Sequence, residues 1–244
     1  MTELVKMSLT GGIAVVTLNR PKKLNAMSRL LIEHLTATIM AVSDEDTLRC
    51  VVISGAGRAF SAGADVEELK SLTPGSAEQF IRLLHKACRA LRDCPVPVIA
   101  KINGPCLGGA LELAASCDMR GASKHSTFAM PEVQVGIPSV IEAALLPRLM
   151  GWGRASELLY TGRTLTAGEA LNAGIIEKIA LSANLDHAVA KWTDAILSAG
   201  PKAIRAQKKL MRQWEKVMID EAIEAGVASF REAYGSDEPR TKLK

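Results

Sequence analysis

The first third of the chain shows two kinds of apolar pattern. Apolar runs at residues 5–9 and 13–18 flank Gly11-Gly12, a pattern typical of a β-hairpin. After a polar loop, Ser28 precedes apolar residues at helical spacing and is expected to cap a helix. The apolar positions of that helix are Leu31, Ile32, Leu35, Ile39 and Val42.

The middle of the chain predicts strands that alternate with helices. Residues 50–54 and 98–102 are mostly apolar, as in strands of a sheet that is covered on both faces. A helix is expected between them, capped by Ser76 and ending near Arg92. Further helices are expected at 108–115, 138–149, 152–160 and 170–173, the last after a capping box at Thr166 and Glu169, with short strands at 118–121 and 175–179.

The last third is helical by pattern, at about 185–198, 201–214 and 217–230, and the polar tail after it is expected to fray. Strands alternating with helices, followed by helices alone, predict an α/β fold with a helical C-terminal segment. We divide the chain into an α/β core at 1–183, which holds the active site, and a helical segment at 184–244.

Composition narrows the class of protein. The chain has 244 residues, a net charge of +4 and only 4% aromatic residues, which argues weakly against a surface that stacks nucleic-acid bases. The five cysteines show no CxxC spacing and are expected to be reduced core residues of a cytoplasmic protein. No apolar run is long enough to cross a membrane, and the four histidines show no metal-binding spacing.

Two loops rich in small residues follow the two apolar strands. The loop GRAFSAGAD spans 57–65, and Gly108-Gly109 opens a helix after the second strand. Free backbone amides in such turns suit an oxyanion or a phosphate. The first loop is not a dinucleotide fingerprint, because Phe60 stands where a third glycine is required.

Two acids lie close to the second loop in the sequence. Glu112 projects from the first turn of an apolar helix, where it is either an exposed acid favoured by the helix dipole or a buried group with a function. Glu132 follows Met130-Pro131 and is either a loop-surface acid or a second member of the site. Two acids beside an oxyanion hole are able to position a water and transfer a proton.

The ordered motifs NRPKKLNAM, GRAFSAGAD, INGPCLGGALELAASCD and FAMPEVQVGIP closely resemble the enoyl-CoA hydratase/isomerase (crotonase) superfamily. The later stretches TGRTLTAGEALNAGIIEKI and GPKAIRAQKKLM resemble that family's continuation, so the likeness covers about residues 5–230. It implies a crotonase-like ββα superhelix core. It also implies a homotrimer or a dimer of trimers, with contacts through the C-terminal helices.

The resemblance implies a role for each matching residue. Ala64 and Gly109 would supply the two backbone amides that hold a thioester oxygen. Glu112 would activate the water, and Glu132 would exchange a proton at the α-carbon. Residues on the path of CoA and substrate would be Lys22, Leu24, Ala26, Arg58, Ala62, Asp65, Val66, Gly108 and Ser139.

The implied reaction is syn addition of water to a 2-enoyl-CoA, a lyase reaction of fatty acid metabolism. It needs no metal or redox cofactor, since the CoA thioester itself accepts the charge. The segment after Glu132 departs from the family, because Ser139 replaces a glycine and bulkier Val140, Ile141 and Glu142 follow. Glu142 is interpreted as a solvated helix residue or, alternatively, a third acid in the pocket.

Three alternatives remain open. The same fold also isomerises enoyl-CoAs or acts on branched or aromatic acyl groups. A non-catalytic RNA-binding relative is suggested by a basic helical stripe, which is otherwise a solvated face or a subunit contact. A serine hydrolase would need Ser61 as nucleophile, but GxSxG is absent. The stripe consists of Lys202, Arg205, Lys208, Lys209 and Arg212.

Overall fold

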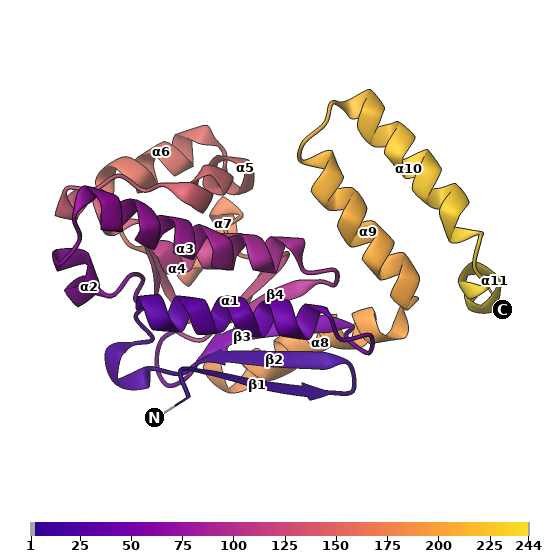
Figure 1. Cartoon of the computed structure of the whole chain (residues 1–244), viewed down its shortest axis with the longest axis horizontal. Helices are drawn as coiled ribbons and strands as arrows, with labels where there is room; N and C mark the ends of the chain where they lie inside the picture. The colour runs from indigo at the N-terminus through magenta and orange to yellow at the C-terminus, as the bar shows by residue number, and fades with distance from the viewer. Residues whose placement is uncertain (1–2, 244) are drawn as a thin grey trace.

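The computed structural model describes residues 3–243 and is built around a six-stranded sheet in the order β1-β2-β3-β4-β6-β9 (Figure 1). The hairpin of β1 and β2 is antiparallel, as predicted around Gly11-Gly12, and every later pairing in this sheet is parallel. The strands are β1 (Val5–Thr10), β2 (Ile13–Leu18), β3 (Cys50–Gly55), β4 (Val98–Ile102), β6 (Met119–Ser123) and β9 (Lys178–Ala180).

Helices cover both faces of this sheet, which explains why its central strands are mostly apolar. The larger core lies between the sheet and α1 (Arg29–Ser43), α3 (Pro74–Asp93) and α4 (Gly109–Ala115). On the other face, α8 (Leu185–Ser198) packs through Val189 and neighbours against the sheet. The alternation of strands and helices therefore gives the α/β class that the sequence predicts.

A second, small sheet was not predicted. It joins β5 (Cys106–Leu107), β7 (Thr127–Ala129) and β8 (Leu165–Thr166). Its strands have only two or three residues each, too short for a periodic pattern to show in the sequence. β5 matters for the site, because it carries the chain from β4 to the start of α4.

The C-terminal helices α9 (Pro201–Trp214), α10 (Ile219–Ala233) and α11 (Glu238–Lys242) extend from the body as an arm (Figure 1). Lys208 is only 5% exposed and pairs with Asp118, which lies between α4 and β6, and Arg205 donates to the carbonyl of Leu48. Of the two interpretations of the basic stripe, a solvated face does not hold for Lys208, because this cation fastens α9 to the core, and a subunit contact stays a prediction. The division of the chain into a core at 1–183 and a helical segment at 184–244 stays a prediction. α8, the first α-helix after residue 184, packs on the sheet.

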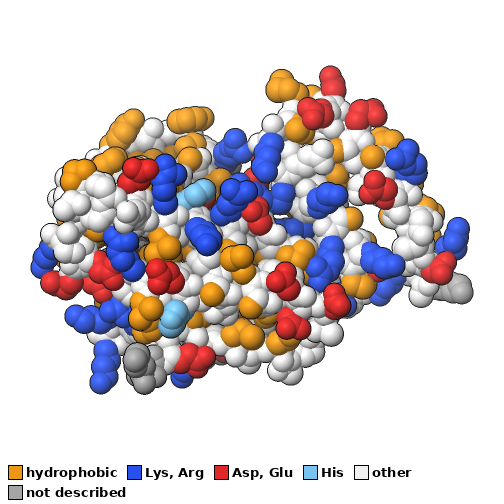
Figure 2. Space-filling model, in the orientation of Figure 1, with side chains coloured by type: hydrophobic (Ala, Val, Ile, Leu, Met, Phe, Trp, Pro, Cys, Tyr) orange, Lys and Arg blue, Asp and Glu red, His pale blue; other side chains and the backbone are white. Residues whose placement is uncertain are grey.

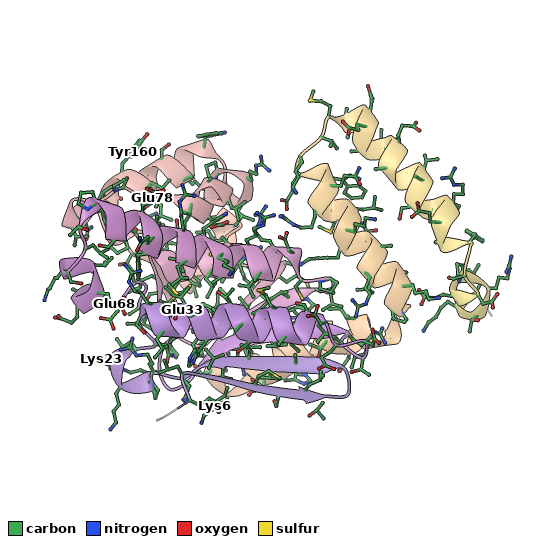
Figure 3. All side chains as sticks on the ribbon, in the orientation of Figure 1. Lys6, Lys23, Glu33, Glu68, Glu78 and Tyr160 are labelled. Carbon is green, nitrogen blue, oxygen red and sulfur yellow. The ribbon has the colours of Figure 1, made fainter. Side chains whose placement is uncertain are left out.

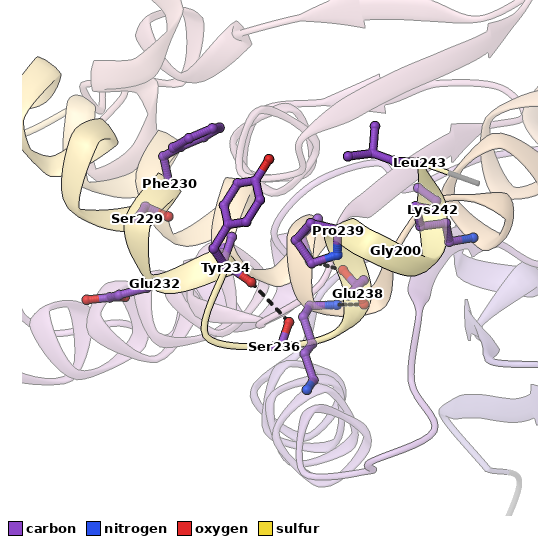
Figure 4. Close-up of a pocket in the computed structure, with 15 residues that line it drawn as sticks. Gly200, Ser229, Phe230, Glu232, Tyr234, Ser236, Glu238, Pro239, Lys242 and Leu243 are labelled. Atoms are coloured by element: carbon purple, nitrogen blue, oxygen red, sulfur yellow. Dashed lines mark hydrogen bonds between the residues drawn. The ribbon is translucent and has the colours of Figure 1, made fainter.

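The sequence suggested a frayed tail, but part of the tail is ordered, because α11 folds back onto the start of α9. Glu238 accepts hydrogen bonds from the backbone amides of Lys202 (3.1 Å) and Ala203 (2.8 Å). Figure 4 shows this carboxylate at the edge of a cavity of about 590 Å³ between the three helices. Ring side chains of Phe230 and Tyr234 form part of its wall, so this C-terminal cavity is largely apolar.

Several helix ends match local sequence signals. Ser28 caps α1 by accepting from Leu31, and Thr166 and Glu169 form the predicted capping box. The predicted cap at Ser76 is wrong: Thr73 caps α3, and Ser76 is the third residue of the helix and completes a capping box. The helix therefore begins three residues earlier than expected, at Pro74.

The single helix predicted over 138–149 is also wrong. Ile141–Leu145 forms the 3-10 helix η3, and α5 (Leu146–Met150) follows, with Pro147 in its first turn. A positive φ of 41° at Ile141 interrupts the α-helical conformation at that residue.

The other elements are η1 (Pro21–Lys23), α2 (Val66–Lys70), η2 (Pro131–Val135), α6 (Trp152–Thr161), α7 (Ala167–Ala173) and η4 (Ser182–Asn184).

The strand predicted at 175–179 begins later than expected. Ile175 and Ile176 are buried before β9 but form no bonds in its strand pairing, which begins at Lys178.

The five cysteines are free and buried, as expected. Within residues 3–243, no helix is long and apolar enough to cross a membrane.

Candidate active site

The two glycine-containing loops converge because they leave neighbouring parallel strands. β3 and β4 pair in parallel, so the loops after them start at the same edge of the sheet. The loops then run side by side: Ser61 N donates to the carbonyl of Pro105, and Leu107 N donates to that of Ser61. A Cβ placed on Gly63 would lie 3.7 Å from the Gly109 nitrogen, so the two turns are in contact.

Asn25 holds the first of these loops and was missed by the sequence analysis. Its side chain is fully buried, and Nδ2 donates to the carbonyls of Ala59 and Phe60. The residue itself has a positive φ of 55°, a conformation that asparagine tolerates better than most residues. A polar residue in the loop NRPKKLNAM thus fixes the position of the next loop along the chain.

The two loops leave a pair of backbone amides without protein acceptors. Within the described residues, neither the Ala64 N–H nor the Gly109 N–H donates a hydrogen bond, although the neighbouring amides of Asp65 and Gly108 do. Gly109 is the first residue of α4, where the amide has no intrahelical partner and carries partial positive charge. Both residues line one cavity, so these donors suit an oxygen that gains negative charge there.

Glu112 is buried, which settles the choice left open by the sequence. Its side chain lies on α4, only 3% of the residue is exposed, and Oε1 accepts a hydrogen bond of 2.9 Å from Ala143 N–H. The removal of this carboxyl from water raises its pKa to about 8, with smaller contributions from the charges of Glu132 and Glu142. The Ala143 amide opposes this effect by stabilising the ionised form.

Glu132 reaches the same cavity from η2. It is half-buried, and Ser139 Oγ donates to its Oε2 at 3.1 Å. A Cβ on Gly108 would overlap Glu132 Oε1, so this carboxyl lies directly over the Gly108 backbone. Burial raises the pKa of Glu132 as well, although the Ser139 bond and a backbone bond lower it.

The cavity that holds both carboxyls, called here the main cavity, has a volume of about 630 Å³. Its remaining wall is mostly apolar and comes from α2, α3 and the segment after Glu132. Among the described residues that line it, Glu78, labelled on α3 in Figure 3, is the only other charged one. The apolar wall consists of Val66, Leu69, Leu72, Phe80, Ile81, Leu84, Val135, Ile137, Pro138 and Val140.

The main cavity brings together many, but not all, of the predicted residues. Its lining includes Ala62, Ala64, Val66, Gly108, Gly109, Glu112, Glu132 and Ser139. Asp65 instead caps α2 through Glu67 N and pairs with Arg20 at 2.9 Å. The predicted residues outside the lining are Lys22, Leu24, Ala26, Arg58 and Asp65.

Most of the apolar wall was not predicted. The signal was present in α3, whose residues Phe80, Ile81 and Leu84 share one face at helical spacing. Such a face is ordinarily packed against the core, and here part of it borders the cavity. The pattern alone does not distinguish the two cases.

Other residues considered in the sequence analysis do not belong to the site in the main cavity. Ser61 is fully buried, donates to the Asn25 carbonyl and accepts from Gly63 N–H, so its hydroxyl is occupied. No cluster of metal-binding side chains occurs among residues 3–243. Both interpretations of Glu142 are wrong: it is buried rather than solvated, and it faces a different cavity.

Comparison with known protein families identifies the chain. A sequence model of the enoyl-CoA hydratase/isomerase family matches residues 8–241. The chain is 34% identical over 235 residues to a short-chain-enoyl-CoA hydratase of Clostridium acetobutylicum, which covers 96% of this chain and 90% of the relative. It is 36% identical over 220 residues to a crotonyl-CoA hydratase of Syntrophomonas wolfei, with 89% and 85% coverage.

Solved structures show the same architecture. The crystal structure of an enoyl-CoA hydratase from Bacillus anthracis superposes with a TM-score of 0.95 at 28% identity, covering 99% of this chain and 95% of that one. An enoyl-CoA hydratase from Thermoplasma volcanium superposes with a TM-score of 0.93 at 30% identity, with 99% and 96% coverage. The similarity in sequence to these relatives and the similarity in fold to these structures both extend over nearly the whole chain. The protein therefore belongs to the enoyl-CoA hydratase/isomerase family and has the crotonase fold.

Proposed function

We propose that the protein is an enoyl-CoA hydratase, a hydro-lyase that adds water syn across the double bond of a 2-enoyl-CoA. The observation that carries this proposal is the placement of two carboxyls and two unpaired backbone amides around one cavity. The relatives named as hydratases support it. The acyl-CoA thioester is the substrate, and its acyl chain fits the apolar wall of the main cavity.

The residues divide the reaction between them. Glu112 accepts a proton from water as the water oxygen bonds to C3 of the substrate. Electrons move to the thioester oxygen, where the Ala64 and Gly109 amides stabilise the developing charge as an oxyanion hole. Glu132 then delivers a proton to C2.

The reaction requires one proton on the pair of acids. With the substrate bound, Glu132 holds this proton before addition and Glu112 holds one after addition, so the number of protons on the pair does not change. Burial raises the pKa of both carboxyls, which supports retention of one proton near neutral pH. The Ala143 amide favours the ionised form of Glu112, the form that acts on water.

No separate cofactor is required, because the thioester accepts the electron pair and no electrons are lost or gained. Lys22, Leu24, Ala26, Arg58 and Asp65 lie outside the main cavity and remain candidates for contacts with the CoA part of the substrate.

Assembly and location belong to the same proposal. We infer a homotrimer or a dimer of trimers, which the exposed apolar side chains of α10 support: Ile219, Ile223, Val227 and Phe230. The free, buried cysteines suit a reducing compartment such as the cytoplasm.

The test is loss of the conjugated-thioester absorbance when the protein is mixed with crotonyl-CoA and longer 2-enoyl-CoAs. We expect Glu112→Gln and Glu132→Gln each to lower kcat by about 10²–10⁴-fold, the usual contribution of a general acid or base. Glu33→Gln, an exposed change on α1 (Figure 3), is the control. Full activity in both active-site variants, or turnover of a 3-enoyl-CoA without any hydration, would contradict the proposal.

A further inference from the structure

Glu142 is a buried carboxylate that the proposed reaction does not use. It lies on η3, only 6% of the residue is exposed, and His85 Nδ1 of α3 lies 2.8 Å from its Oε1. Its Oε2 is buried and has no hydrogen-bond partner among the described residues. Burying a carboxyl oxygen without a hydrogen-bond partner lowers the stability of the folded protein, so the residue calls for an explanation.

Glu142 lies in the wall between two cavities. On α3, Leu84 lines the main cavity, and the next residue, His85, lines a separate side cavity of about 370 Å³. On the other segment, Val140 lines the main cavity, and Glu142 lines the side cavity. The bond between Glu142 and His85 therefore joins η3 to α3 behind the main cavity.

The backbone next to Glu142 makes the contact with Glu112. Ala143, the following residue, donates its N–H to Glu112 Oε1. Ile141, the preceding residue, has a φ of 41°, which a β-branched side chain adopts only under strain of about 1–3 kcal/mol. Surrounding contacts must hold this turn in place, and they include the packing of Ile141 against the core and the bond of the adjacent Glu142 to His85.

The charge of Glu142 also acts on Glu112. After burial, the negative charges of Glu132 and Glu142 both raise the pKa of Glu112. The Cys88 thiol of α3 is close to both Glu112 and Glu142, and burial with these charges raises its pKa well above the ordinary value, so it stays neutral.

The side cavity that Glu142 lines is rich in basic side chains. Figure 2 shows Lys and Arg side chains gathered over α3 and towards α9, on the same part of the surface. Arg92 and Arg212 share Glu215, and Arg89 pairs with Asp93. The charged groups of this cavity are His85, Arg89, Arg92, Asp93, Arg212, Lys216 and Glu142 itself.

We propose that Glu142, anchored by His85, is a positioning residue for Glu112: it holds the Ala143 amide against the Glu112 carboxyl and places a second acidic side chain behind it. The inference rests on the proposed function only in taking Glu112 as the base that acts on water. Glu142 itself touches no reacting atom.

The experiment separates charge from position. Glu142→Gln keeps an acceptor for His85 and removes the charge, whereas Glu142→Ala removes both, and His85→Asn keeps a donor near the Nδ1 position. Carbon-13 NMR of the glutamate carboxyls in the substrate-free protein, with Glu112 assigned from Glu112→Gln, reports its titration. Activity on crotonyl-CoA gives kcat and KM as functions of pH.

We expect Glu142→Gln to lower the Glu112 midpoint, and with it the basic limb of kcat/KM, by about one pH unit. We expect Glu142→Ala to lower kcat about tenfold while KM stays within twofold, and His85→Asn to stay close to wild type. Glu33→Gln and the exposed His187→Asn on α8 are the controls.

Two results would overturn the inference: a Glu112 midpoint in Glu142→Gln equal to that of the control, or kcat and KM changing together with the melting temperature, as for a merely structural residue. Absence of hydration by the wild-type protein would instead reject the proposed function. The carboxyl titration is measured without substrate, so it decides the inference even then.

Discussion

At the residue scale, environment rather than residue type decides the chemistry of Glu112. An acid in the first turn of a helix is usually exposed and stabilised by the helix dipole. Here the residue is almost fully buried, and its hydrogen-bond donor is the amide of Ala143, 31 residues away in sequence. Distant residues thus turn a common helix-start acid into a candidate base.

The raised pKa of Glu112 predicts how stability depends on pH. Below pH 4.5 the carboxyl is protonated in both the folded and unfolded states, and burial carries no penalty. Between 4.5 and about 8 the folded state keeps a proton that the unfolded state releases, so the free energy of unfolding falls as pH rises. We expect Glu112→Gln to be more stable than wild type by roughly 2–4 kcal/mol at pH 8 and equal to it near pH 4.

Urea unfolding of the two proteins between pH 4 and 8.5 measures this difference. The variant keeps an amide oxygen to accept the Ala143 N–H, so the hydrogen bond itself is not removed. A stability difference that stays constant across the range would show that Glu112 titrates normally in the folded protein.

Activity should reflect the same pair of acids. The proposed reaction needs one proton on Glu112 and Glu132 together, so kcat/KM for hydration is expected to be bell-shaped in pH. The basic limb should lie near pH 8, where the pair loses its remaining proton. Initial rates with crotonyl-CoA in buffers of constant ionic strength provide the check, and a rate that keeps rising above pH 9 would disagree with it.

Gly108 is a residue where a single methyl group is expected to matter. Its φ is 53°, and an added Cβ would occupy the position of Glu132 Oε1. We expect Gly108→Ala to displace that carboxyl, lowering kcat about 10²-fold and stability by about 1–2 kcal/mol. Gly153→Ala is the matched control, because an added Cβ there meets nothing within 4 Å. Equal kcat in the two variants would mean that Glu132 is not held over Gly108.

At the scale of elements, the segments predicted correctly are those with local causes. Ser28 caps α1 through an amide three residues away, and Gly11-Gly12 turns a hairpin whose strands are adjacent in sequence. The segment 138–149 was mistaken for one helix, because its apolar residues have helical spacing. The strained turn at Ile141 depends on contacts with α3 and α4 that no local pattern contains.

The attachment of α9 rests on an element-scale contact that can be tested. Lys208 is buried and paired with Asp118, whose other contact is the Val98 amide. We expect Lys208→Met to destabilise the protein by about 1–3 kcal/mol, because Asp118 keeps a partly buried charge without its partner. Hydrogen exchange in α9 should increase at the same time.

Lys209→Met is the control for that change, since Lys209 is the next residue on the same helix and is exposed. Comparable exchange rates in the two variants would indicate that the ion pair does not fasten the arm. A solvated basic face, as the sequence suggested, would give that result.

At the scale of the whole molecule, the body and the arm have different surfaces. The body encloses two cores, one on each face of the sheet, whereas α10 presents apolar side chains to solvent. An apolar face of this kind is typical of a subunit contact. The arm is therefore where the proposed trimer is expected to form.

We expect Ile223→Asp on this face to lower the oligomeric mass in light scattering coupled to size-exclusion chromatography, because a charge would be buried at the contact. Glu224→Gln, an exposed change one position along the same helix, should leave the mass unaltered. If both variants keep the wild-type mass, the contact lies elsewhere.

Local patterns in the sequence are enough to identify the elements whose causes are local, and the ordered motifs identify the family and the residues to examine. Glu112, Glu132 and the glycine turns were identifiable because their neighbours in the chain are informative. The folded arrangement was needed to show which of them share a cavity, that Lys208 is buried, and that Glu142 contacts His85 behind the site. Burial and charge depend on residues that are distant in sequence, and the pKa values of the acids follow from both.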